Sequence, residues 1–222
     1  ACLPATGRLS HDSWREHVKR FIPVLSDGDV YSDFSPLRLQ LEIQEKLGKH
    51  LYEIVSPFWH KDVKSWLDLE DEVYACPPTG VRRGREIRGE VHDDNAYVVA
   101  EKVAHAGLFG TIGGVCETLL NMDRELDLLE SMSHRFDEGE KEGRRFVRGW
   151  DTVSDPQNTL AGEGCGEKTF GHLGFTGTSI WIDCEKRKGH VILSNATQKY
   201  WFAREGLNAL RRELGKRAWS RE

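Results

Sequence analysis

The chain has 222 residues and a mass of 25.3 kDa, the size of one ordinary domain or two small ones. Hydrophobic residues make up 38% of it and include seven Trp and nine Phe, enough to build a core, which argues against disorder. The net charge of −5 argues against a nucleic-acid binder, and the apolar runs are too short to span a membrane.

The first residues and the cysteines say little about the compartment. The chain starts at Ala1, and its first ten residues have neither a basic start nor a long apolar stretch, so we expect no signal peptide in it. The number of cysteines is odd and none forms a Cys-x-x-Cys pair, which argues against a disulfide framework or a zinc site.

Helices are predicted in the first half of the chain. Ser35-Pro36 supplies an N-cap and a first-turn proline and Gly48 a stop, which predicts a helix over 36–47. Apolar residues within 51–58 continue as a second, short helical stretch. Residues 76–96 begin with a Pro- and Gly-rich cluster and carry four arginines beside four acidic residues, which is typical of a solvated surface loop.

A single helix and a long loop follow. Apolar side chains recur at spacings of 4 and 3 and predict one helix face that begins after Gly113-Gly114: Val115, Leu119, Met122, Leu126 and Leu129. Residues 137–168 contain six glycines and few periodic apolar residues, so we expect a long loop there.

The C-terminal part reads as a β-meander and a helix. Three strands are predicted, joined by short links that favour antiparallel pairing: Thr169–Gly174, Ser179–Cys184 and His190–Asn195. An amphipathic helix follows, with its apolar face formed by Tyr200, Ala203, Leu207, Leu210 and Leu214.

The predicted fold class is therefore α/β of the α+β type, an antiparallel sheet with a C-terminal helix packed on it plus a mainly helical region. Its expected parts form one fold overall. They are an N-terminal segment (1–30), the mainly helical region (31–136), a Gly-rich loop (137–168), and the three-stranded meander with its helix (169–222).

The most specific string is FGHLGFTGTSIWID, residues 170–183. It places His172 at the end of a strand, directly before a tight Gly-x-x-Gly turn. An edge strand can offer backbone N–H groups to a developing oxyanion, and a cation on it can attract a carboxylate. The string resembles the third motif of the serine β-lactamase and penicillin-binding-protein superfamily, which includes class C β-lactamases, DD-peptidases and related esterases.

Other matches to that superfamily run in the same order, from about residue 1 to residue 215. Tyr31-Ser32-Asp33 is similar to its second motif, and Gly149-Trp150-Asp151-Thr152 resembles a loop of the family. The strings GEVHDDNA (89–96) and AHAGLFGT (104–111) resemble a further stretch of the family pattern. The resemblance implies a β-lactamase/transpeptidase-like fold, a small-molecule or peptide substrate, no cofactor, and a periplasmic or secreted protein, although a cytoplasmic one stays open.

The resemblance also assigns roles to residues. Tyr31 would be the general base or proton relay, which requires nearby cations because a free Tyr has a pKa near 10. Asp33 would orient Tyr31 or the substrate, and His172 would be the strand cation or a proton donor. Gly174 and the backbone N–H of Phe175 would bind the substrate at the oxyanion position. The alternatives are a packing Tyr, an Asp that favours a helix start, a half-exposed strand His and a turn aromatic.

Four residues have side chains that could bind a metal: His92, Asp93, Asp94 and His105. Their spacing matches no usual metal site, so we expect none. His105 is expected to order a loop.

Three departures from the family pattern matter. No Ser in the 222 residues is followed three places later by Lys, although Ser-x-x-Lys carries the nucleophile in the family. Cys2-Leu3-Pro4 resembles a stretch that lies downstream of that motif, so we expect the N-terminal part of the family fold to be absent from this sequence. Leu173 stands where the family usually has Thr or Ser, and Leu cannot hydrogen-bond to a substrate carboxylate. Asp33 in place of Asn is common in hydrolase branches.

Three hypotheses follow. The chain could belong to a serine hydrolase whose nucleophile comes from the missing portion. It could be a non-catalytic relative that binds a peptide, a cell-wall fragment or a partner protein, or an unrelated α+β interaction domain. Loss of the N-terminal strands would expose apolar surface, so we expect a homodimer or a complementing N-terminal segment, and neither a nucleic-acid partner nor a membrane span.

Overall fold

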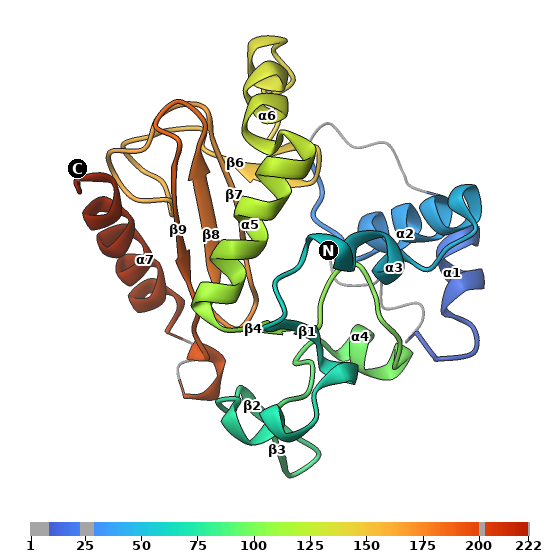
Figure 1. The fold of residues 1–222 in the computed structure, drawn as a ribbon. Helices are drawn as coiled ribbons and strands as arrows, with labels where there is room; N and C mark the ends of the chain where they lie inside the picture. The colour runs from blue at the N-terminus through green and yellow to red at the C-terminus, as the bar shows by residue number, and fades with distance from the viewer. Residues whose placement is uncertain (1–8, 23–28, 200–202, 222) are drawn as a thin grey trace. The chain divides into compact units, whose positions relative to one another are not determined.

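The computed structural model describes residues 9–22, 29–199 and 203–221 and divides the chain into two compact units, Ala1–Val115 and Cys116–Glu222 (Figure 1). The division falls within helix α5 (Ile112–Leu126). Among the described residues no helix is long and apolar enough to cross a bilayer.

The first unit is mainly helical with two small sheets. Its helices are α1 (Trp14–Arg20), α2 (Phe34–Leu47), α3 (Leu51–Val55) and α4 (Asp94–Val99), with 3-10 turns η1 (Ser56–Phe58), η2 (Trp66–Asp68) and η3 (Asp71–Ala75). Strand β1 (Val63–Ser65) pairs antiparallel with β4 (Leu108–Gly110), and β2 (Gly80–Arg82) with β3 (Arg85–Ile87). Trp14, Val18, Leu37 and Val99 are among the fully buried members of one core that joins α1, α2 and α4.

Helix α2 confirms the predicted helix but starts earlier. Asp33, not Ser35, is the N-cap, and Pro36 lies in the first turn, where a missing N–H breaks no helical hydrogen bond. The predicted stop is confirmed: Gly48 has φ 63°, a left-handed conformation that glycine adopts without a steric cost.

The prediction of a plain surface loop over 76–96 was wrong. The segment contains the β2–β3 hairpin and the start of α4. Arg83 and Gly84 connect the two strands with φ angles of 50° and 78°, the positive pair that a two-residue hairpin turn of type I′ requires. The turn was not predicted because the surrounding charged residues indicated a loop and because an Arg-Gly pair is a weaker hairpin signal than Asn-Gly.

The single helix predicted through Leu129 was also wrong. It is two helices, α5 and α6 (Leu128–Asp137), separated by Asp127 with φ 48°. The Asp123 carboxylate accepts the N–H of Leu129 at 2.8 Å, so a side chain satisfies one of the unpaired donors at the start of α6.

The second unit contains a five-stranded antiparallel sheet in the order β5-β6-β7-β8-β9. The predicted meander is confirmed as β7 (Thr169–Leu173), β8 (Ser179–Asp183) and β9 (Lys188–Ile192), the last of which begins and ends earlier than expected. The expected loop over 137–168 holds two further strands, β5 (Phe146–Val147) and β6 (Trp150–Thr152). They are too short to show a period, and Arg148-Gly149 joins them with φ 51° and 88°.

The two faces of this sheet bury different cores. Side chains alternate along β7 and β8, so Phe170 and Ile182 share one face while Trp181 lies on the other. The first face packs with Met132 of α6, and the second with Val153, Ala161 and Trp219 of helix α7 (Arg204–Trp219).

Helix α7 exists as predicted, but the predicted apolar face was wrong. Leu210 and Leu214 are 49% and 38% exposed, and the buried residues are Arg211, Gly215 and Trp219. The cause is a close backbone approach: a Cβ on Gly215 would lie 2.0 Å from the carbonyl oxygen of Ala161. This approach selects the helix face that carries the glycine. Tyr200, expected on the same face, lies outside the described residues.

Candidate functional site

The predicted site residues fall into two groups, one in each unit, and each group is described by itself. Tyr31 and Asp33 lie at the start of α2 in the first unit. His172, Gly174 and Phe175 lie at the end of β7 and in the turn after it, in the second unit. The structure thus brings together the members of each group.

The Tyr31-Ser32-Asp33 segment leads into α2. The Tyr31 side chain is 53% exposed, which differs from the alternative of a buried packing Tyr. The Ser32 hydroxyl accepts the N–H of Phe34 at 3.2 Å and so satisfies one of the unpaired donors at the helix start. Asp33 makes no side-chain cap, and its Oδ2 instead accepts a hydrogen bond from the Asn95 amide at 3.0 Å.

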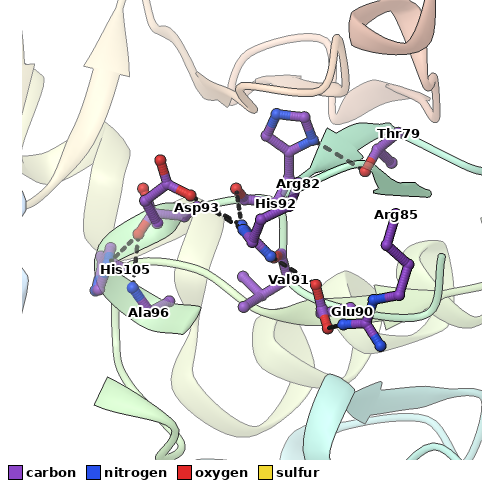
Figure 2. Close-up of polar contacts among 10 residues, drawn as sticks. Thr79, Arg82, Arg85, Glu90, Val91, His92, Asp93, Ala96 and His105 are labelled. Carbon is purple, nitrogen blue, oxygen red and sulfur yellow. Dashed lines mark hydrogen bonds and ion pairs between the residues drawn. The ribbon is translucent and has the colours of Figure 1, made fainter. Parts of the chain in front are cut away.

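Asp93 and His105 form a partly buried pair beside this segment. Asp93 is the N-cap of α4, and its Oδ1 accepts the N–H of Ala96 at 2.8 Å and pairs with His105 Nε2 at 3.0 Å (Figure 2). The His105 side chain is only 3% exposed. Burial acts to raise the pKa of Asp93, but hydrogen bonds from His105 and the Ala96 amide outweigh it and leave that pKa below its usual value.

Three ligand-type atoms meet here. One atom each from Asp33, Asp93 and His105 lie within 4.8 Å of one another. A metal bound through His105 Nε2 would leave the proton on Nδ1, and metal-bound histidines normally donate that proton to an acceptor. His105 Nδ1 is buried and has no hydrogen-bond partner among the described residues. The donor set therefore fits an Asp93–His105 hydrogen bond better than a metal ion.

The wider cluster of four ligands considered from the sequence is not assembled. The His92 ring points away from Asp93, and its Nδ1 lies 2.9 Å from the Thr79 hydroxyl (Figure 2). Burial, with a further contribution from the positive charge of Arg82, lowers the pKa of His92.

Arg82 is a residue whose role the sequence did not reveal, because it was read as part of a solvated loop. Its side chain is only 10% exposed and forms ion pairs with Glu90 at 2.6 Å and Asp94 at 3.1 Å. It also donates to the carbonyls of Val91 and His92, and its guanidinium lies 4.0 Å from the centroid of the Tyr97 ring. Figure 2 shows Arg82 holding the backbone from which Asp93 projects. Arg82 is therefore a structural support for the Asp93–His105 pair.

The end of β7 corrects one sequence expectation. β7 is not an edge strand, because it pairs with β8 along its length and with β6 at Phe170 and Gly171. The β6 register stops there, so His172 and Leu173 extend past it. The N–H groups that could meet a substrate are therefore confined to the last residues of the strand and the turn.

His172 and Leu173 point to opposite faces of the sheet. The His172 ring lies 6.4 Å from that of Phe146 in β5, and its Nδ1 lies 3.0 Å from the Leu173 carbonyl. Leu173 packs on the opposite core with Trp181 and Trp219. The side chain that departs from the family pattern is thus partly buried against a core here.

The turn after β7 has a defined geometry. The Gly174 N–H donates to the carbonyl of Thr178 at 2.8 Å, and the Gly177 N–H donates to that of Gly174 at 3.1 Å. A Cβ on Gly174 would lie 1.8 Å from the Thr178 hydroxyl, so a larger residue at this position would force the Thr178 side chain to move. Phe175, at the tip, is 55% exposed.

Phe146 lies beside His172, and Arg145 lies beside Phe146; the sequence gave no signal for either residue because β5 was not expected. Arg145 forms a two-point ion pair with Asp151, at 2.9 and 2.6 Å, and its guanidinium lies 5.0 Å from the centroid of the Phe146 ring. The β5–β6 hairpin therefore places an aromatic ring beside the predicted strand cation.

Comparison with known proteins adds a family and relatives. The beta-lactamase family model matches residues 58–213. The chain is 34% identical over 120 residues to an Escherichia coli (strain K12) protein named "Putative D-alanyl-D-alanine carboxypeptidase", a match that covers 48% of this chain and 26% of that protein. It is 27% identical over 178 residues to an N-acetylmuramyl-L-alanine amidase of Bacillus subtilis (strain 168), covering 75% of this chain and 39% of the relative. No solved structure matches. The chain thus spans well under half the length of these relatives.

Proposed function

Because the chain belongs to the beta-lactamase family, we propose that it forms the proton-transfer and oxyanion-binding part of a serine hydrolase that cleaves an ester, amide or lactam by acyl transfer. The observation that carries this proposal is the end of β7, where the hydrogen-bonded Gly174–Thr178 turn follows His172 and Leu173, within the residues that the family model matches. Its β-lactamase/transpeptidase-like fold is part of the same proposal.

The proposed chemistry needs three groups. A serine hydroxyl from polypeptide outside these 222 residues attacks the carbonyl carbon and gives its proton to Tyr31 in its phenolate form, which a nearby cation must keep ionised. The Phe175 N–H donates to the oxygen on which negative charge develops. The bond to the leaving group then breaks, the leaving group takes up the proton, and water releases the acyl group.

The position of Leu173 bears on the substrate. The Leu173 side chain packs against a core and carries no hydroxyl, so it offers a substrate carboxylate no hydrogen bond. We therefore expect uncharged esters to be better substrates than compounds with a free carboxylate next to the scissile bond.

A second candidate is a non-catalytic binder of a peptide or a cell-wall fragment. It is favoured by one observation, the absence of any Ser-x-x-Lys string in the 222 residues. The two candidates share the same residues but differ in whether a bond is broken.

The test is hydrolysis of p-nitrophenyl acetate by the chain alone and by the product of its complete gene. We expect hydrolysis only when a Ser-x-x-Lys segment is present, with loss of kcat in Tyr31→Phe. Tyr74→Phe is the matched control, because Tyr74 is also exposed and belongs to the same unit. Unchanged kcat in Tyr31→Phe, or a complete gene without the serine motif, would refute the catalytic proposal and favour the non-catalytic binding protein.

A further inference from the structure

Arg211 of α7 is a buried cation for which the proposed chemistry gives no account. Its side chain is 5% exposed, and none of the ion pairs among the described residues includes it. Burial lowers its pKa. A buried charge without a counter-ion is costly, so its contacts must offset that cost.

Those contacts lead to the turn after β7. Arg211 Nη2 donates to the carbonyl of Thr178 at 2.9 Å and lies 3.4 Å from that of Gly174. These are the same two carbonyls that accept the hydrogen bonds within the turn. A single guanidinium nitrogen therefore bridges the two ends of the turn. Nη1 is held by Asn208 Oδ1 at 3.2 Å.

The Arg211 Nε–H group is buried and has no partner among the described residues. An unpaired buried donor is uncommon and needs an explanation. The guanidinium is oriented so that Nη2 reaches the two turn carbonyls, and this orientation leaves the Nε–H group unpaired.

The helix that carries Arg211 is itself fixed. One turn further along, Gly215 lies against the backbone of Ala161, and the Trp219 indole donates to the Ala161 carbonyl at 2.8 Å. The guanidinium therefore projects from a rigid support. Such a support is what a precisely placed binding group requires.

We propose that Arg211 is the positioning residue for the Gly174–Thr178 turn, holding the Phe175 N–H in place for a developing oxyanion. The inference rests on the proposed function, in which that N–H binds the substrate oxygen. By holding both carbonyls, the guanidinium fixes the span of the turn and polarises its hydrogen bonds. A donor held in place before the reaction stabilises the transition state without reorganising.

The first measurement is amide hydrogen exchange in the 222-residue chain. Arg211→Met is expected to speed exchange of the Gly174 and Gly177 amides by about tenfold, with β8–β9 amides unchanged. Arg211→Lys keeps the charge and can donate to one of the two carbonyls, so its exchange rates are expected to lie between those of the wild type and Arg211→Met. It also serves as a second variant if Arg211→Met fails to fold. Arg212→Met is the matched control, because Arg212 is exposed on the same helix.

The second measurement is ester hydrolysis by the product of the complete gene. We expect Arg211→Met to lower kcat about tenfold or more with little change in KM, and Arg211→Lys to recover part of it. Faster exchange throughout the sheet, unchanged exchange in the turn, or an unchanged kcat would each overturn the proposal. If the wild-type protein hydrolyses no ester, the proposed function fails, whereas the exchange data still decide whether Arg211 holds the turn.

Discussion

Asp93 and His105 are joined at 3.0 Å between Oδ1 and Nε2, and twelve positions of sequence separate them. The pair links the N-terminus of α4 to the segment before β4, and the Ala96 N–H shares the same carboxylate oxygen. One oxygen therefore serves both a helix cap and a long-range contact, so the ionised state of Asp93 should matter to the stability of the first unit.

Asp93→Asn should destabilise the first unit at pH 7 by about 1.5–3 kcal/mol, the range for a hydrogen bond to a charged group. The pKa of Asp93 is lowered in the folded state, so its contribution is present above the unfolded value near 3.9 and lost as pH falls through the folded pKa. Urea unfolding at pH 7 and pH 3 should therefore show a smaller difference between variant and wild type at pH 3. Asp12→Asn, at an exposed site, is the control; equal effects from both variants would contradict the argument.

The stability contributed by His190 also falls as pH falls, but in a range nearer to neutral pH. Its ring lies 5.1 Å from the Trp219 ring, and its Nε2 lies 2.9 Å from the Ala161 carbonyl. Burial lowers its pKa, against a smaller opposing effect of the Ala161 carbonyl, so the unfolded chain takes up a proton near pH 6.5 before the folded chain does. Stability from neutral His190 is complete above that pH and declines below it.

His190→Gln should therefore weaken the fall in Tm between pH 7.5 and pH 5.5. His50→Gln is the control, because His50 is exposed and its side chain makes no cap to α3. A fall in Tm that is as steep in His190→Gln as in the wild type would show that another group titrates.

Gly215→Ala should destabilise the second unit by about 1–3 kcal/mol, because the added methyl meets a backbone carbonyl that cannot turn aside. Gly206→Ala in the same helix has open space around its new Cβ and should stabilise by about 0.5–1 kcal/mol. Chemical denaturation of the two variants measures both signs in one helix. Two changes of the same sign would refute the close approach as the cause.

Arg83→Asn should stabilise the β2–β3 hairpin by about 0.5 kcal/mol, since Asn adopts a positive φ more readily than Arg. Gly84→Ala, at φ 78° with open space around it, should cost about 1 kcal/mol through backbone strain alone. Thermal unfolding of both variants checks the pair. Destabilisation by Arg83→Asn would point to an unrecognised contact of the arginine.

Sequence patterns predicted the elements that are long enough to show a periodic pattern. They missed very short strands and features that depend on a close contact between two backbone segments. The meander, α2 and α7 followed from alternation, caps and helical spacing. The strands β5 and β6 have two and three residues, too few for a period, and the face of α7 was set by Gly215 rather than by its leucines.

The candidate site shows the same division. The strings that contain Asp33, Asp93, His105 and His172 could be read along the chain. The hydrogen bonds of Arg82 and Arg211 could not, because each guanidinium reaches main-chain carbonyls, and carbonyls have no signature in the sequence. Such partners become visible only when the backbone is placed.

The glycine contact at Ala161 makes α7 intolerant of changes in length. Each residue of an α-helix turns the next by about 100°, so one residue inserted between Arg211 and Gly215 would swing the guanidinium to another side while the glycine stays docked. Substitutions at the exposed Leu210 and Leu214 do not change the angle around the helix between Arg211 and Gly215. The four-residue interval between Arg211 and Gly215 should thus be more tightly constrained than the identity of the leucines between and beside them.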